Sequence, residues 1–472
     1  MAGFTHTVAL LSLLTTTAFI SSFVVSQPPL DPAEQESVYR ILESVNSGIP
    51  WRSLFPDDLC SSSPHGVVCD YFSDAAESSD GPGTPHVTEL SFGYVSDYSP
   101  NPPCDFNSTL DPSLLVPLSH LRKLFFYKCF TQTQVPFPDF SPLSSQNRSA
   151  SLEELVFVEN PGLVGSLDGK ISNLRSLRRL VLTGSGVSGG ISDGFGELVN
   201  LEQLTVSRNK FKGEILMATF QNLKKLRVLD LSDNGLEGKV PESIGNLTEV
   251  LKIDLSYNGF SGRIPEILKG LKSLEFLDLS YNSFGNFGVP LFLAEMPSLR
   301  EVYLSGNYLG GQIPEIWGNL GGIKGIGLSG VGLVGDIPKS MGVHLRNLCY
   351  LGLDNNRLEG VVPEEFEDLE FVSEMNLVKN NLSGRLPFSA AFLSKLGGKL
   401  KLEGNSDLCI DEALRSAKIS GRLGQLKVCR QPDLPQTALL NVNSCPSLHA
   451  SSLMAIIPIG LLLLCVCLFL AS

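Results

Sequence analysis

The chain has 472 residues, ten cysteines and a formal net charge of −13. Neither residues 1–26 nor residues 449–472 contain Asp, Glu, Lys or Arg, so the charge belongs to the middle of the chain. This acidic balance argues against nucleic acid or anionic lipid as the main partner.

The start of the chain has the pattern of a secretory signal peptide, expected at residues 1–26. Val8–Leu14 and Ala18–Val25 are apolar, and small residues precede an expected cleavage before Gln27. The stretch departs from the usual pattern because it has no Lys or Arg near its start. Secretion is also favoured by four N-glycosylation sequons, which begin at Asn107, Asn147, Asn246 and Asn381.

Residues 27–86 are expected to form an N-terminal cap. Asp31–Ser47 places apolar side chains at helical spacing, with Pro32 in the first turn, and this predicts a short helix. Asp74–Pro85 is rich in Ser, Asp, Gly and Pro, which predicts an exposed loop.

Residues 87–151 are expected to contain two irregular repeats with insertions. Val87–Phe92 and Leu121–Phe126 both have strand spacing. The insertions lie at Ser96–Leu115 and Thr131–Ala150. The second one contains Phe137 and Phe140, and both insertions are expected to be surface loops or to contribute to a partner contact.

Residues 152–405 repeat one phrase, and a clear copy is LRVLDLSDNGLEGKVP at Leu226–Pro241. An asparagine slot recurs every 24 or 25 residues, and nine of its eleven occupants are Asn, so the repeat is not a chance pattern. This is the leucine-rich-repeat signature, in which each unit contributes one strand and a 3₁₀ or irregular return. The slots are Asn160, Ser185, Asn209, Asn234, Asn258, Asn282, Asn307, Val331, Asn356, Asn380 and Asn405.

The positions of this phrase have structural reasons. Leu229 and Leu231 point to the same face of a strand, and no unit can bury its leucines alone, so neighbours must stack into a repeat solenoid. The Asn side chains can bind backbone groups where the chain leaves each strand, and stacked units would form an asparagine ladder. Two departures from the phrase, at residues 282–290 and at Val331, are attributed to drift.

Cysteines stand on both sides of the regular repeats. The ends of a stacked array expose an apolar cross-section, so disulfide-stapled caps are expected in an oxidising compartment. Cys349 has no cysteine near it in sequence and is expected to be a buried free thiol. The pairs expected from proximity are Cys60–Cys69, Cys104–Cys129 and Cys409–Cys429.

The C-terminal part is expected to form a cap over residues 406–430, with a helix at Asp411–Val428. A polar stalk at residues 431–452 then leads to a hydrophobic tail at residues 453–472. The tail fits either a single membrane-spanning helix or the signal for a glycolipid anchor. We favour the anchor, because no Lys or Arg flanks the uncharged run Leu453–Leu470. The attachment residue would be Asn443 or Ser444.

Motifs for chemistry are missing from the sequence. There is no phosphate-binding loop, zinc-spaced Cys/His set or kinase signature, and His344 is the one histidine within the regular array. We therefore predict a protein that is not an enzyme, with no cofactor and no metal site.

The concave strand face is the expected contact surface, because its outward side chains have no packing role. Equivalent residues of stacked strands lie about 4.8 Å apart, so aspartates and tyrosines would form neighbouring columns. The aspartates also fit a plain consensus role, since LDLSxN is a frequent form of the repeat. Gly327, Gly330 and Gly352 would admit a close-lying peptide backbone. The candidate partner-binding residues are Asp230, Asp233, Asp254, Tyr257, Asp278, Tyr281, Tyr303 and Tyr350.

The LxGxIP form of the turn carries a resemblance to a known family. It occurs at Leu236–Pro241, Phe260–Pro265, Leu309–Pro314, Leu333–Pro338, Leu358–Pro363 and Leu382–Pro387. With it, the chain resembles plant extracellular leucine-rich-repeat receptor-like proteins, in particular the Too Many Mouths and Piriformospora indica-insensitive group. The irregular N-terminal region with extra cysteines and the uninterrupted array agree with that group.

This resemblance implies a plant-type superhelix and a protein at the extracellular face of the plasma membrane. It further implies that the protein binds a secreted peptide or protein ligand and joins a receptor-kinase ectodomain in developmental or microbial-response signalling. The alternative is a wall-associated protein similar to the polygalacturonase inhibitors, or an adhesion scaffold. The hydrophobic C-terminus counts against that alternative, because those inhibitors are soluble.

Overall fold

The computed structural model describes residues 28–73, 83–94, 101–144, 151–416 and 426–430. The chain divides into a unit that ends at Cys429 and a second unit that begins at Arg430. The expected signal peptide, the Asn147 sequon, the stalk with Asn443 and Ser444, and the hydrophobic tail lie outside the described residues. Among the described residues, every helix is too short or too polar to cross a membrane.

The N-terminal cap is built on the expected helix, α1 (Pro32–Val45), which Asp31 caps by accepting backbone N–H bonds. Helices α2 (Trp51–Leu54) and α3 (Leu59–Ser62) follow, and β1 (Val67–Phe72) then pairs antiparallel with β2 (Thr84–Phe92). The loop expected at 74–85 is therefore wrong at its end, because Thr84 and Pro85 pair with β1.

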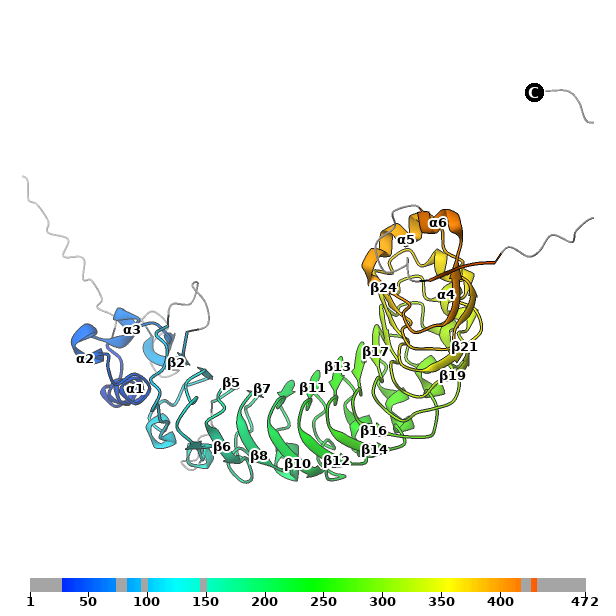
Figure 1. The fold of residues 1–472 in the computed structure, drawn as a ribbon. Coiled ribbons are helices and arrows are strands. Elements are labelled where there is room, and N and C mark those ends of the chain that lie inside the picture. The colour runs from blue at the N-terminus through cyan, green and yellow to red at the C-terminus, as the bar shows by residue number, and fades with distance from the viewer. Residues whose placement is uncertain (1–27, 74–82, 95–100, 145–150, 417–425, 431–472) are drawn as a thin grey trace, which may run out of the picture. The chain divides into compact units, whose positions relative to one another are not determined.

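One strand from each repeat joins a sheet of 14 strands, which is parallel from β2 onward and follows the inner side of the curved array (Figure 1). The register aligns equivalent residues, so that Asp254 lies between Asp230 and Asp278. The strands after β2 are β3 (Lys123–Tyr127), β5 (Glu154–Val158), β7 (Arg179–Thr183), β9 (Gln203–Thr205), β11 (Val228–Asp230), β13 (Lys252–Asp254), β15 (Phe276–Asp278), β17 (Glu301–Tyr303), β18 (Gly325–Gly327), β20 (Tyr350–Gly352), β22 (Glu374–Asn376) and β24 (Leu400–Lys401).

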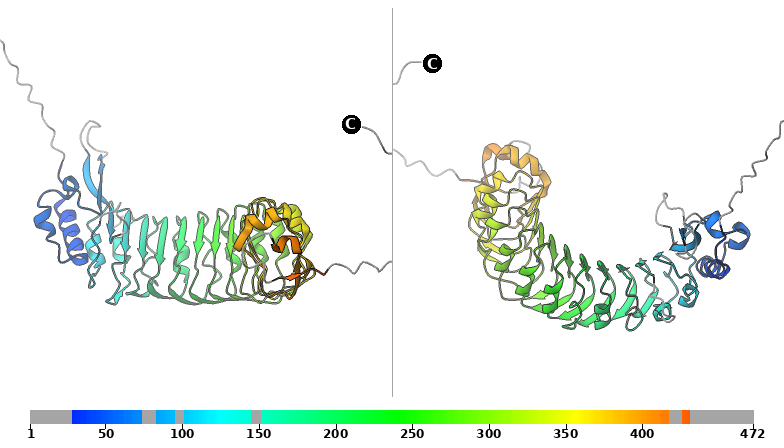
Figure 2. Two further views of the ribbon diagram at one scale, coloured as in Figure 1. Left: turned by 45° about the horizontal axis from the view of Figure 1, so that its top comes forward. Right: turned by 180° about the vertical axis from the view of Figure 1, so that it is seen from behind.

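A second set of short parallel strands follows the other side of the array, and Figure 2 shows the repeats side by side from two further directions. Its seven-stranded part comprises β4 (Val135–Pro136), β6 (Leu163–Ser166), β8 (Gly186–Gly189), β10 (Lys210–Glu214), β12 (Gly235–Gly238), β14 (Gly259–Gly262) and β16 (Ser283–Phe284). The remaining strands form two smaller sheets, with β19 (Val334–Asp336) beside β21 (Arg357–Glu359) and with β23 (Ser383–Arg385), β25 (Asp407–Ile410) and β26 (Lys427–Val428) side by side.

Short helical turns complete most repeats, as the strand-and-return pattern predicts. The 3₁₀ turns are η1 (Pro112–Leu115), η2 (Ser141–Ser144), η3 (Asp193–Glu197), η4 (Glu242–Asn246), η5 (Glu266–Gly270), η6 (Leu291–Glu295), η7 (Trp317–Asn319), η8 (Glu364–Asp368) and η9 (Gly397–Lys399). The α-helical ones are α4 (Lys339–His344) and α5 (Ala390–Leu396). This architecture confirms the repeat solenoid.

The asparagine ladder forms as expected. Asn258 Nδ2 donates to the carbonyl of Leu231 in the preceding repeat at 3.0 Å, and its Oδ1 accepts the N–H of Leu236 at 3.0 Å. Leu229 and Leu231 are fully buried beside it. Two of the asparagine slots hold another residue. Val331 packs into the core, whereas the buried hydroxyl of Ser185 has no hydrogen-bond partner among the described residues.

The second insertion does not present its aromatic residues to a partner. Phe137 and Phe140 are buried and pack against each other edge to face, and Phe137 also packs on Phe157. The expectation of a surface loop or a partner contact is therefore wrong for these two residues, because they fill the core beneath the irregular repeats.

Three disulfides join the cysteine pairs expected from proximity: Cys60–Cys69, Cys104–Cys129 and Cys409–Cys429. Cys349 is free, but it is half-buried rather than buried. The helix expected at 411–428 is limited to α6 (Glu412–Ser416) in the described residues, and Lys427–Val428 is strand β26 instead, since it pairs with β25 beside the last disulfide.

Candidate ligand-binding face

An ion-pair cluster holds the aspartates of the inner sheet face. Lys252 Nζ lies 3.2 Å from Asp230 Oδ2 and 3.4 Å from Asp254 Oδ2, and both carboxylates are about 15% exposed. Burial opposes the charge of Lys252, but the two carboxylates outweigh it and raise the pKa of Lys252. The predicted acidic column is therefore partly neutralised from within.

Asp278 differs from its two neighbours in the column. It accepts a hydrogen bond from the Ser280 N–H at 2.8 Å, and no lysine or arginine of the described residues forms an ion pair with it. Burial raises the pKa of Asp278, the bonds from Ser280 offset part of this, and the charge of Asp254 adds to the rise. The inner face thus keeps an excess of negative charge at this strand.

An aromatic platform follows Asp278 along the sheet, formed by Phe276, Tyr303 and Tyr350. The ring centroid of Tyr303 lies 5.8 Å from that of Phe276 and 6.2 Å from that of Tyr350. Tyr303 Oη donates to Glu301 Oε2 at 2.8 Å, and burial together with this bond raises the pKa of Tyr303. Lys252 Nζ lies 5.1 Å from the Phe276 centroid and joins the platform to the ion pairs by a cation–π contact.

Glycines let these tyrosine rings lie flat on the sheet. A Cβ at Gly327 would lie 2.7 Å from Cδ1 of Tyr303, and one at Gly352 would lie 2.6 Å from Oη of Tyr350. The prediction that Gly327 and Gly352 admit a peptide backbone is therefore wrong, because tyrosine rings already cover them. Gly330 has no atom within 4 Å of the corresponding point and remains open.

A stacked tyrosine pair lies beside the platform, in the turns that follow the strands. Tyr257 and Tyr281 have ring centroids 4.3 Å apart and planes 18° apart, and they are 54% and 50% exposed. Both have φ of 53°, and Asp233 occupies the same position of its turn with φ of 52°. The array enforces this left-handed conformation immediately before each asparagine slot, so the three side chains project from equivalent points.

Lys252 and Phe276 were not among the residues predicted for this face. Both occupy the strand position two residues before the aspartate column, and β-strand alternation places them on the same face as Asp254 and Asp278. This alternation is the signal that would have found them. Their inclusion changes the candidate face from an acidic column into an ion-paired cluster that continues into an aromatic surface.

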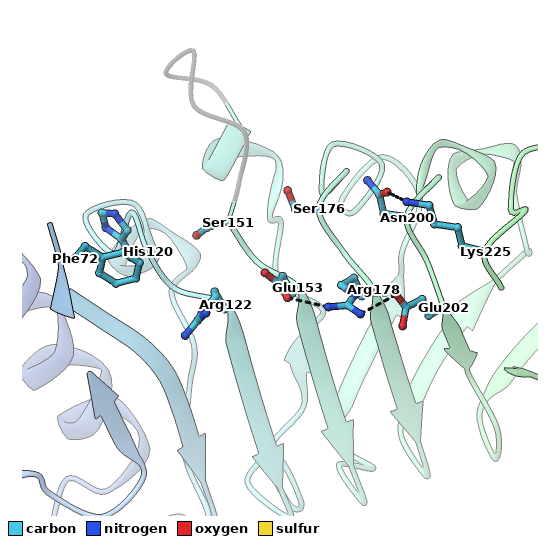
Figure 3. Close-up of a pocket in the computed structure, with 10 residues that line it drawn as sticks. All are labelled: Phe72, His120, Arg122, Ser151, Glu153, Ser176, Arg178, Asn200, Glu202 and Lys225. Carbon is cyan, nitrogen blue, oxygen red and sulfur yellow. Dashed lines mark hydrogen bonds and ion pairs between the residues drawn. The ribbon is translucent and has the colours of Figure 1, made fainter. Parts of the chain in front are cut away.

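The N-terminal part of the array carries a different surface, at the points where its strands begin. Arg178 lies between Glu153 and Glu202, with N–O distances of 3.6 and 2.8 Å (Figure 3). These side chains line a shallow hollow of about 530 Å³ whose far end is bounded by Phe72 and His120. The hollow is therefore mainly an ion-paired surface.

A cluster of Glu34, His86 and His120 lies next to that end. Glu34 is 3% exposed, and its Oε1 lies 2.6 Å from Nδ1 of His86. The rings of His86 and His120 stack with centroids 3.9 Å apart. This set could not be recognised as a sequence motif, because its members lie 52 and 34 residues apart in three different parts of the chain.

Three sequon asparagines lie within the described residues. Asn107 and Asn381 are exposed and Asn246 is half-buried, so none lies in the core. Their modification remains a prediction.

Family models for "Leucine rich repeat" match residues 199–260, 224–284, 298–320 and 347–369. Three curated relatives come from Arabidopsis thaliana. Piriformospora indica-insensitive protein 2 is 36% identical over 34% of this chain and 35% of its own length. Receptor like protein 29 is 35% identical over 36% and 34%, and Protein TOO MANY MOUTHS is 35% identical over 31% and 27%. The chain thus spans about a third of the length of these relatives.

A solved structure extends the likeness to receptor ectodomains. The leucine-rich-repeat ectodomain of the Arabidopsis thaliana receptor kinase GASSHO1/SCHENGEN3, in complex with CASPARIAN STRIP INTEGRITY FACTOR 2, matches with a TM-score of 0.51 and 26% identity. The match covers 64% of this chain and 37% of that one. The stacked units and these matches define a leucine-rich-repeat protein. More particularly, the matched part of the chain is similar to plant leucine-rich-repeat receptor-like proteins.

Proposed function

We propose that this protein is a cell-surface receptor-like protein that binds a peptide or protein ligand on its inner sheet face and acts together with a receptor-kinase ectodomain. The observation that carries the proposal is the aromatic platform of Phe276, Tyr303 and Tyr350. The residues next to them in the same strands point to the opposite face of the sheet and are buried aliphatic residues. The platform is therefore not needed to close the core.

The chemistry of the platform suits recognition of an extended chain. Tyrosine offers a large apolar ring and a polar tip at low entropic cost, and such residues dominate binding energy at protein interfaces. The glycines of β18 and β20 hold the rings flat, which pre-organises them before a ligand arrives. The paired Asp230, Lys252 and Asp254 border the platform with polar groups that are already satisfied.

The likeness to known proteins supports the same assignment. One matched ectodomain is that of a membrane receptor kinase in complex with a partner that its description names CASPARIAN STRIP INTEGRITY FACTOR 2. We propose that this chain also carries a signal peptide, N-linked glycans and a membrane anchor. An extracellular location agrees with the three disulfides, since such bonds persist in oxidising compartments.

Affinity capture tests the function directly. The full chain, tagged internally after residue 430 and expressed in plant cells, would be cross-linked at the cell surface and recovered from a membrane extract. Mass spectrometry should find one or a few receptor kinases enriched over a tagged unrelated ectodomain. Recovery of a wall polygalacturonase without any receptor kinase would contradict the proposal and favour the inhibitor-like alternative.

A further inference from the structure

We propose that Glu34, His86 and His120 form a binding site for a divalent transition-metal ion, with zinc as the ion that their chemistry suits best. The site lies in the N-terminal cap and does not depend on the proposed receptor function. It would join three parts of the chain: helix α1, strand β2 and the segment that leads into β3.

The geometry brings the three donors to one point. Each residue offers one ligand atom, and these atoms all lie within 4.8 Å of one another. Donors around a tetrahedral zinc ion lie about 3.3 Å apart when metal–ligand bonds are about 2.0–2.1 Å long. The cluster must therefore contract by about 1.5 Å at most, a movement within the reach of two imidazole rotations.

The side chains differ in freedom in a way that favours such a movement. The Glu34 side chain is 4% exposed and is fixed by the Val87 N–H, which donates to its Oε2 at 3.1 Å. The His86 side chain is 20% exposed, and His120 is half-buried. A fixed carboxylate thus faces two less buried rings. Binding of an ion would exchange the contacts of His86 Nε2 with Thr84 Oγ1 at 3.3 Å and of His120 Nδ1 with Ser119 Oγ at 3.0 Å, and it would end the 3.9 Å stacking.

The donor set selects the class of ion. Two imidazoles and one carboxylate are the three-ligand set of many zinc sites that keep a fourth position for water, whereas magnesium and calcium prefer oxygen donors alone. Zinc binds imidazole in its neutral form, so in the metal-bound site the carboxylate would supply one negative charge to the divalent cation. Arg122, which lines the hollow, is already paired with Asp70.

Access and shielding are both present. Phe72 packs on His120 with centroids 4.4 Å apart and on His86 at 5.8 Å, and it forms an apolar wall on one side. Phe72 and His120 also line the hollow, and we expect the ion and its fourth ligand to enter from that end (Figure 3). A simple buried Glu–His hydrogen bond would involve Glu34 and His86 alone, so the behaviour of His120 separates the two explanations.

Zinc titration of the purified full chain, carrying a histidine-free tag, tests the site. Isothermal calorimetry should find one Zn²⁺ per chain with micromolar or tighter affinity, and Zn²⁺ but not Mg²⁺ should raise Tm. His120→Gln should weaken binding at least about tenfold, and so should His86→Gln. His65→Gln and His344→Gln, which change exposed histidines outside the cluster, should leave the affinity unchanged.

Two results would overturn the site: no heat and no rise in Tm with zinc, or binding that persists undiminished in His120→Gln. If His86→Gln fails to fold, because Glu34 loses its partner, His120→Gln alone decides. X-ray absorption of the one-to-one complex should show two imidazoles bound to zinc, and a spectrum without them would also refute it. Partner capture reports on the receptor function separately, so failure of either proposal leaves the other standing.

Discussion

Aromatic residues serve opposite purposes in the irregular repeats and in the central repeats. Near the N-terminus, the rings of Phe126 and Phe157 stack inside the core with centroids 5.1 Å apart, and Phe137 packs on Phe157 from the second insertion. In the central repeats, Tyr257 and Tyr281 stack with centroids 4.3 Å apart but are half exposed. Stacking alone therefore does not show what an aromatic residue is for; its side of the strand does.

Ion pairs also differ between the N-terminal and the central repeats. The pairs of the N-terminal repeats, such as Arg179 with Glu154, are 45% and 30% exposed. In the central repeats Lys252 sits between two carboxylates that are about 15% exposed. The outward charges near the N-terminus are thus solvated surface, whereas those of the centre belong to a partly desolvated cluster beside the aromatic platform.

The largest expected effect separates the two aromatic groups. Phe137→Ala should destabilise the protein by about 3–4 kcal/mol, because it removes a buried ring and leaves a cavity. Tyr281→Ala should cost less than about 1 kcal/mol, because its half-exposed ring closes no part of the core. Urea unfolding of both variants measures the difference, and equal losses would erase the distinction between core and surface aromatics.

A smaller effect separates the two kinds of ion pair. Lys252→Met should destabilise by about 1–2 kcal/mol, since it leaves two partly buried carboxylates without their cation. Arg179→Met should cost about 0.5 kcal/mol or less, because its pair is exposed. Converting Asp230 and Asp254 to Asn in the Lys252→Met background should restore part of the loss. Similar unfolding midpoints for the two single variants would contradict this contrast.

The smallest effect concerns Asp278. Its pKa is raised in the folded protein, so ionisation of Asp278 lowers stability once the pH exceeds its usual range, and the cost vanishes when both states are protonated. Asp278→Asn should therefore raise Tm at pH 7 by about 1–2 °C, and the gain should fade towards pH 3. The control Asp233→Asn, in an exposed turn, should show no such gain. A gain that is independent of pH would show that the cause is not ionisation.

The repeat solenoid could be predicted from the sequence because its causes are local and recur. The asparagine slots and the paired leucines such as Leu229 and Leu231 predict the same structural unit in each repeat. The disulfide pairs followed from proximity for the same reason. The aspartates and tyrosines of the central face were placed correctly on neighbouring strands and turns, since the period fixes their register.

The features that could not be predicted depend on how side chains pack once the repeats are stacked. Gly327 looked like open space, yet the ring of Tyr303 from the neighbouring strand occupies it. Phe137 stood in an insertion without repeat spacing, so nothing in the sequence showed that it turns into the core. The Glu34, His86 and His120 cluster needed the antiparallel pairing of β1 and β2, which the sequence did not reveal.

The most direct test of the central claim compares two pairs of aromatic residues on the same sheet. Tyr303→Ala with Tyr350→Ala removes the platform, and the matched control Phe125→Ala with Tyr127→Ala removes two outward aromatics of β3. Co-purified receptor kinase, quantified after surface cross-linking, should fall at least about 30-fold for the platform variant and less than about 3-fold for the control. Equal recovery with both variants, at equal surface expression, would contradict the assignment of ligand binding to the central inner face.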